Sequence, residues 1–171
     1  FYPEQVTDVN SMNDGEHFTS LDLDYDFEIM SINKYTYADY KKIGTIISSD
    51  NIPGKSIDDY HFNHDESKLL IATSMESIYR HSTKSNYYIY DIKSKELTPL
   101  TDFELGKQRL AEFSPTGDNI AFVRDNNIFI KNIITNEETV VTNNGKINEV
   151  INGATDWVYE EEFSFDKGFE W

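Results

Sequence analysis

The feature that most constrains the fold is a unit of about fifty residues that recurs along the chain. The segments 59–72 and 110–122 read alike, and their matching residues Phe62 and Phe113 lie 51 residues apart. A fainter copy, residues 11–18, begins 51 residues before Phe62. Each copy predicts a strand, a tight turn rich in Asp, Asn, Gly or Pro, and a second strand.

A further apolar run follows each copy and predicts a third strand, at residues 27–30, 87–92 and 127–133. A polar turn and a last short apolar segment then complete each unit. Four strands in about 50 residues is the period of a β-propeller blade. We therefore expect an all-β fold, a partial β-propeller of about three four-stranded blades with a short helical insertion.

The predicted blades occupy residues 6–50, 57–104 and 108–144, with an insertion between blades at 150–166 and a next blade starting at 169–171. Propellers close with four to eight blades, so three blades predict an incomplete propeller. Unpaired sheet edges are templates for association. We expect the isolated chain to self-associate rather than to melt as a cooperative monomer.

Composition excludes several classes of function. The chain of 171 residues has 15 Lys and Arg against 31 Asp and Glu, a net charge of −16. Such a charge repels nucleic acid and favours cationic ligands. Cys is absent, so disulfides and thiolate chemistry are excluded. No apolar run approaches the roughly 20 residues that cross a bilayer, so no membrane span is expected.

The most unusual local feature is the run Glu160-Glu161-Glu162, which directly follows Trp157-Val158-Tyr159. Adjacent carboxylates beside large aromatic rings are costly to bury without a cation. An ammonium group, such as a free peptide N-terminus, is the natural partner, and an Arg elsewhere in the chain could support the site. Glu-rich runs also form solvated helix faces, and composition alone leaves that interpretation open.

Longer motifs carry a resemblance to a known family. The block Asp156-Trp157-Val158-Tyr159-Glu160-Glu161-Glu162, preceded by Asn152-Gly153-Ala154-Thr155, resembles the double-Glu segment of the dipeptidyl peptidase IV family. Tyr79-Arg80-His81-Ser82 resembles a loop in the second blade of that family. Phe113-Ser114-Pro115-Thr116-Gly117 is similar to its third blade. The resemblance extends over nearly the whole chain, from about Val9 to Trp171.

The resemblance implies an eight-bladed N-terminal propeller that caps a C-terminal α/β-hydrolase domain of the same polypeptide. It implies a serine exopeptidase that releases N-terminal dipeptides ending in Pro or Ala. The family's Glu pair corresponds to Glu161 and Glu162, and its Arg corresponds to Arg80. These three would bind the free α-amino group of peptide substrates. Glu160, Tyr159, Trp157 and His81 are expected to support them.

No catalytic residue is expected in this chain, because it contains no Gly-x-Ser-x-Gly segment that could hold the nucleophile. The resemblance further implies a possible homodimer and a periplasmic or cell-surface location in a bacterium. Metals and cofactors are not expected. The four His residues lack the i, i+4 spacing of zinc ligands, namely His17, His61, His64 and His81.

The insertion is expected to form a short helix from about Asp156 to Phe163, in which Glu161 and Glu162 lie about 100° apart and converge on one cation. Two alternatives to a dipeptidyl peptidase remain. The chain could belong to a non-catalytic propeller that binds partners, or to a related tripeptidyl aminopeptidase. Pockets for the substrate side chains are not encoded in these residues, so the sequence does not separate the two peptidases.

Overall fold

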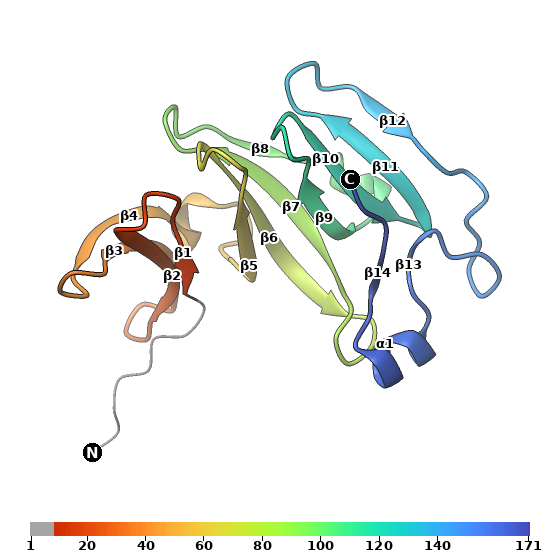
Figure 1. The fold of residues 1–171 in the computed structure, drawn as a ribbon, viewed down its shortest axis with the longest axis horizontal. Coiled ribbons are helices and arrows are strands. Elements are labelled where there is room, and N and C mark those ends of the chain that lie inside the picture. Colours follow the sequence, from red (N-terminus) through yellow and green to blue (C-terminus); the bar gives the residue numbers. More distant parts are fainter. Residues whose placement is uncertain (1–8) are drawn as a thin grey trace. The chain divides into compact units, whose positions relative to one another are not determined.

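The computed structural model describes residues 9–171, so residues 6–8 of the expected first blade lie outside the described part. The chain divides into two compact units, one ending at Asp59 and one beginning at Tyr60 (Figure 1). None of the helices within residues 9–171 is long and apolar enough to cross a membrane.

The first unit contains one antiparallel sheet with the strand order β1-β2-β3-β4. Its strands are β1 (Asn10–Ser11), β2 (His17–Asp24), β3 (Ile29–Thr36) and β4 (Lys42–Ser48), followed by the 3₁₀ turn η1 (Ser49–Asn51). Phe18, Ile32 and Ile47 are buried. The third strand begins at Ile29 rather than at Phe27, because residues 27 and 28 complete the turn and Glu28 adopts a positive φ of 54°.

The second unit contains two further four-stranded antiparallel meanders, β5-β6-β7-β8 and β9-β10-β11-β12. The strands of the first are β5 (Asp59–Phe62), β6 (Lys68–Ser77), β7 (Thr83–Asp91) and β8 (Leu97–Pro99). The turn η2 (Phe103–Leu105) leads to β9 (Arg109–Phe113), β10 (Asn119–Arg124), β11 (Asn127–Asn132) and β12 (Glu138–Val140). The prediction of an all-β partial propeller with three four-stranded blades is confirmed.

The repeat of 51 residues has a direct structural meaning. Ser11, Phe62 and Phe113 each end the first strand of a sheet. The next residue in each case donates its N–H across the turn to the carbonyl five residues ahead, in the pairs Met12–His17, Asn63–Lys68 and Ser114–Asn119. Local turn chemistry therefore sets the same register in all three blades.

One apolar core holds the two sheets of the second unit together. Leu70, Leu100, Ile120 and Phe122 are fully buried in it. Phe129 packs against this cluster, and its ring is stacked on that of Phe122 at a centroid distance of 5.5 Å. Each of the two sheets therefore buries one of its faces against the other in this core.

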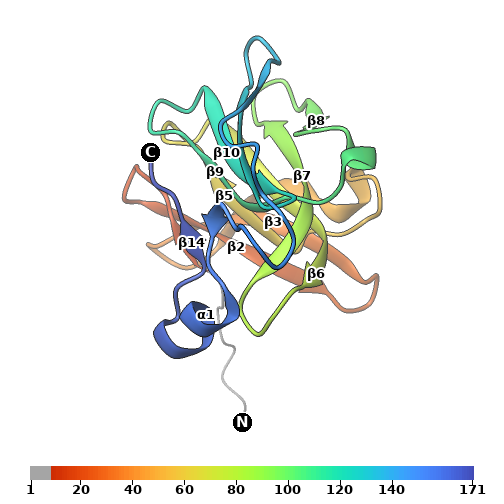
Figure 2. The ribbon, with the colours of Figure 1, turned by 90° about the vertical axis from the view of Figure 1, so that its right-hand side faces the viewer.

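A hairpin follows the last blade and carries the only α-helix of the described residues. Its two-residue strands β13 (Gly153–Ala154) and β14 (Lys167–Gly168) pair antiparallel, and the helix α1 (Trp157–Phe163) lies at its tip. In both ribbon views α1 lies beside the loop that joins β6 to β7 (Figures 1 and 2). The expected helical insertion is thus present.

Candidate functional site

The site is built where the hairpin tip meets the loop between β6 and β7, which comprises residues 78–82. Asp156 caps the helix, because its carboxylate accepts hydrogen bonds from the N–H groups of Val158 (3.0 Å) and Tyr159 (3.2 Å). Ser164 ends the helix in the left-handed conformation, with a φ of 52°. The helix is therefore only seven residues long, and its orientation depends on contacts outside itself.

Glu160 makes the contact that fixes the helix. Its side chain is buried, with 1% of the residue exposed. Its Oε1 atom accepts hydrogen bonds from the main-chain N–H groups of His81 (2.7 Å) and Ser82 (3.0 Å). Residues separated by almost eighty positions in the sequence are thereby joined, and α1 is attached to the loop 78–82.

The pKa of the Glu160 carboxyl lies below its usual value. Burial alone would raise it, but the hydrogen bonds from the N–H groups of His81 and Ser82 stabilise the charged form and outweigh the burial. Glu160 is therefore ionised at neutral pH. It was expected as a supporting residue, and its contact is with main-chain groups of the loop.

The attachment brings Arg80 and Glu161 together. Arg80 Nη1 lies 3.4 Å from Glu161 Oε2, and the side chains are 72% and 15% exposed respectively. Glu162 is exposed on the adjacent position of the helix. Of the three residues expected to bind an amine, the structure pairs two and leaves the third facing solvent.

The other expected supporting residues contribute less. His81 acts through its main-chain N–H, and its side chain is exposed. Trp157 and Tyr159 are each about half exposed, so packing covers only part of their rings. The ring of Tyr159 lies against Phe163, with a centroid distance of 5.8 Å. Sequence reasoning missed one residue near the site, Arg109, which no local motif singles out.

Two cavities flank the site. One of about 440 Å³ is lined by Tyr79, Arg109 and Thr155 among others. The other, of about 510 Å³, is open and lies against Tyr159 and Phe165. Within residues 9–171, no group of three or more His, Asp or Glu side chains is arranged to hold a metal ion.

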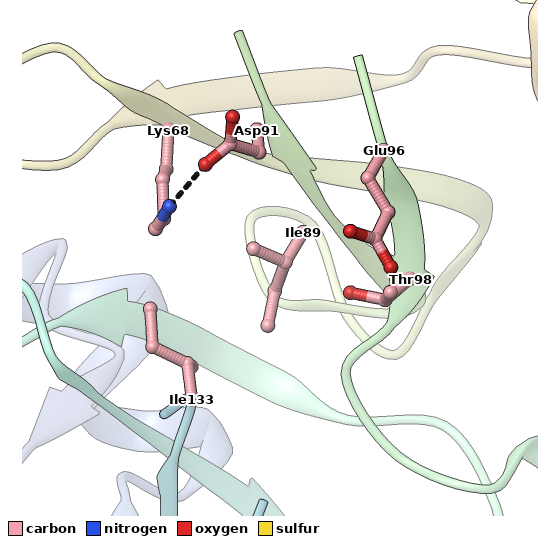
Figure 3. A pocket seen from close by; sticks show the side chains of 6 residues that line it. All are labelled: Lys68, Ile89, Asp91, Glu96, Thr98 and Ile133. Carbon is pink, nitrogen blue, oxygen red and sulfur yellow. Dashed lines mark hydrogen bonds and ion pairs between the residues drawn. The ribbon is translucent and has the colours of Figure 1, made fainter. Parts of the chain in front are cut away.

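A smaller pocket of about 200 Å³ lies away from this site (Figure 3). Lys68 begins strand β6, whereas the loop 78–82 follows the end of that strand. In the pocket, Lys68 Nζ lies 2.5 Å from Asp91 Oδ2, its cross-strand neighbour. The hydrogen bond from Lys68 holds the pKa of the Asp91 carboxyl below its usual range. These two charges neutralise each other, and Glu96 is the other charged residue in the lining.

Comparison with known proteins agrees with the geometry. The family model described as "Dipeptidyl peptidase IV (DPP IV) N-terminal region" matches residues 63–171. Dipeptidyl peptidase 4 of Trichophyton equinum is 37% identical over 163 residues, which is 95% of this chain and 20% of that protein. A probable dipeptidyl peptidase 4 of Aspergillus fumigatus is 38% identical over 127 residues, covering 74% of this chain and 16% of that protein.

Two solved structures also match this chain. Dipeptidyl peptidase 4 of Porphyromonas gingivalis matches with a TM-score of 0.83 and 42% identity, over 93% of this chain and 22% of that one. An acylaminoacyl peptidase of Pyrococcus horikoshii matches with a TM-score of 0.50 and 12% identity, over 80% of this chain and 25% of that one, and shares the fold alone. The chain thus spans about a fifth of the length of the curated relatives named above. With more than half of its residues matched by the family model, this chain belongs to the family of the dipeptidyl peptidase IV N-terminal region.

Proposed function

We propose that this chain is the substrate-sensing part of a serine exopeptidase that releases N-terminal Xaa-Pro and Xaa-Ala dipeptides. Glu161 and Glu162 bind the free α-ammonium group of the substrate, and Arg80 assists them. One observation carries the proposal: Glu160 anchors α1 to the amides of His81 and Ser82, which sets Glu161 against Arg80.

An exopeptidase requires a group that binds the free N-terminus of its substrate. A peptide α-amino group has an unperturbed pKa of about 7.7–8.0 and is mostly cationic at neutral pH. Two carboxylates can accept its three N–H donors, and each charge-assisted bond contributes roughly 1.5–3 kcal/mol. An internal amide in that position would leave the carboxylates unpaired, so the site also rejects chains without a free end.

Arg80 has a second task in this proposal. Its guanidinium is planar and carries five donors, so one nitrogen can pair with Glu161 while others reach a substrate carbonyl. The 72% exposure of its side chain leaves it accessible to a ligand. It also offsets part of the repulsion between the neighbouring carboxylates.

The nucleophile and its partners are supplied by a hydrolase domain of the same polypeptide, since these 171 residues contain no Gly-x-Ser-x-Gly segment. The chain described here positions the substrate terminus and does not hydrolyse peptides by itself. Because this chain binds the α-amino group and the hydrolase domain cleaves the peptide, the scissile bond lies two residues from the bound amine.

The test uses the full polypeptide encoded by the gene and the substrate Gly-Pro-p-nitroanilide. Glu161→Gln and Glu162→Gln keep the size of the side chain and remove its charge. We expect each to lower kcat/KM by about 10- to 100-fold, the equivalent of one charge-assisted bond. The matched control is Glu104→Gln in η2, an exposed carboxylate outside the site, which should leave kcat/KM unchanged.

Product masses from a Gly-Pro-containing pentapeptide separate the alternatives. Release of a dipeptide supports the proposal, release of a tripeptide indicates a tripeptidyl aminopeptidase, and no release with any peptide indicates a binding protein. Wild-type kcat/KM in both Glu variants of an active peptidase would contradict the sensing role.

A further inference from the structure

The hairpin of β6 and β7 carries the loop 78–82, and its pairing is irregular close to that loop. The register shifts between Thr73 and Glu76, because three steps along β6 match two steps along β7. The extra residue makes a β-bulge, and Ser74 within it has a φ of 53°, a left-handed conformation. A bulge bends its strand, so the end of the hairpin and the loop 78–82 take their direction from it.

Lys107 holds this bulge from outside the hairpin. Its Nζ atom donates to the main-chain carbonyl of Ser74 at 2.5 Å and to Glu76 Oε1 at 2.7 Å. Only 21% of the Lys107 side chain is exposed, so water and salt screen these contacts less than those of a fully exposed lysine. Glu76 Oε2 also lies 3.0 Å from Lys84 Nζ on β7. The ammonium of Lys107 therefore ties the bulge to the carboxylate that follows it, and this carboxylate ties both to β7.

The main chain at Lys107 is itself fixed beside the hairpin. The next residue, Gln108, exchanges two main-chain hydrogen bonds of 2.8 and 2.9 Å with Ser85 of β7. Gln108 and Ser85 are both fully buried. The side chain of Gln108 donates to Thr101 Oγ1 at 2.9 Å and to the carbonyl of Gly106 at 2.6 Å. The side chain of Lys107 thus reaches the bulge from a backbone that is already attached to β7.

Packing does not hold the loop 78–82 on the side of Lys107. Ile78, Tyr79 and Lys107 are among the residues that line one cavity of about 440 Å³. Side chains do not fill a space of this size, so the loop depends on individual contacts rather than on a close-packed core. The anchor at Glu160 acts on the main chain of the loop, whereas Lys107 acts on the strand that leads into it.

We propose that Lys107 is a positioning residue for the binding of the substrate amine. It holds the bulge of β6 at one curvature, and so keeps Arg80, the middle residue of the loop, beside Glu161. The inference rests on the proposed function of Arg80 and the Glu pair. Without this ammonium group, the bulge and the carboxylate of Glu76 lose a shared partner, and the end of the hairpin changes its direction. The guanidinium of Arg80 is then aligned less well with the substrate.

The experiment compares Lys107→Met and Lys107→Arg in the full polypeptide with Gly-Pro-p-nitroanilide. We expect Lys107→Met to raise KM about three- to tenfold while kcat changes less than about twofold, because the substrate is held less well but the hydrolase chemistry is untouched. Lys107→Arg keeps the charge and the donors and should recover most of the loss. The matched control is Lys131→Met, which removes a hydrogen bond of 2.8 Å to the main-chain carbonyl of Asn136 in the turn before β12. It should leave KM unchanged.

A double-mutant comparison isolates the coupling between Lys107 and Arg80. On an Arg80→Gln background the guanidinium is gone, so Lys107→Met should raise KM further by less than about twofold. A merely structural role of Lys107 would affect KM equally with and without Arg80. Such an equal effect would overturn the proposal, as would an unchanged KM in Lys107→Met.

Two further measurements keep the test decisive. If Lys107→Met does not fold, Glu76→Gln replaces it, since this variant weakens one of the two contacts of the ammonium group. It should raise KM about two- to threefold at an unchanged kcat, and a wild-type KM would contradict the proposal. If Glu161→Gln leaves KM unchanged, the amine-sensing function itself fails. If Glu161→Gln raises KM and Lys107→Met does not, only the role of Lys107 fails.

Discussion

Glu160, Glu161 and Glu162 are identical side chains in three different environments. The first is buried and accepts two main-chain hydrogen bonds, the second pairs with Arg80, and the third is exposed. Each step along a helix turns about 100°, so three consecutive residues must face three directions. The run could not serve as one uniform acidic patch, and the triplet divides into one anchor and two candidate ligands.

Arg80 offers a test at the scale of one residue. Arg80→Lys should leave Tm almost unchanged, since exposed ion pairs contribute only about 0–1 kcal/mol. The same substitution should raise KM for Gly-Pro-p-nitroanilide several-fold, because an ammonium group cannot form the paired hydrogen bonds of a guanidinium. Thermal melting and steady-state kinetics measure the two effects.

The control for Arg80 is Lys55→Gln, which removes an exposed ion pair with Asp50 (3.3 Å) in the first unit. It should change neither Tm nor KM. An unchanged KM in Arg80→Lys would identify an ordinary surface ion pair and contradict the role of Arg80 in binding substrate.

At the scale of elements, the hairpin β13–α1–β14 depends on a glycine at its base. Gly153 has a φ of 75°, and a Cβ there would lie 2.7 Å from Ile128 Cγ1 and 2.7 Å from Val123 Cγ2. Both the backbone conformation and the close packing on the sheet therefore require Gly. The hairpin is tied to the last blade at this point.

Gly153→Ala should lower the free energy of unfolding by about 1–3 kcal/mol and raise KM, because the displaced hairpin carries α1. Denaturant unfolding and the chromogenic assay measure these effects. The matched control is Gly44→Ala in β4, where a Cβ meets nothing within 4 Å. It should be nearly neutral. Wild-type stability in Gly153→Ala would show that the hairpin adjusts its distance from the sheet.

At the scale of the whole molecule, the excess of carboxylates controls how stability depends on pH. Several of them have pKa values below the usual range because they accept hydrogen bonds in the folded chain. The side chain of His17 and the N–H of Glu16 lower the pKa of Asp14 to about 2, and Lys68 lowers that of Asp91. The pKa values of Asp65, Glu76 and Asp118 are also lowered.

The sign of the pH dependence follows. A carboxylate whose pKa is lowered in the folded state stabilises the fold when the pH is above its pKa in the unfolded chain, about 4. This stabilisation is lost as the pH falls toward the lower pKa of the folded state. We expect Tm to fall between about pH 4 and pH 2. Asp91→Asn should reduce the slope in this range, while Glu104→Gln, at an exposed position of η2, should not. Parallel Tm curves for Asp91→Asn and the wild type would contradict the assignment.

The sequence by itself determined the blades and the helix. The 51-residue spacing marked the ends of β1, β5 and β9, and the run from Asp156 to Phe163 predicted α1. These features depend on the alternation of apolar and polar residues, on turn residues and on capping residues, all within a few positions of one another. The local sequence is therefore enough to predict them. The motif Tyr79-Arg80-His81-Ser82 also identified the loop that α1 contacts.

Only the tertiary structure decided which Glu became the anchor and which Lys holds the hairpin of β6 and β7. The contact of Glu160 with the His81 and Ser82 amides spans almost eighty residues, and no local period encodes it. Lys107 contacts the bulge of β6 from more than 30 residues away, and the bulge is itself a shift of register. A one-residue change of register moves a side chain to the other face of a sheet, so it becomes visible only once the strands are paired.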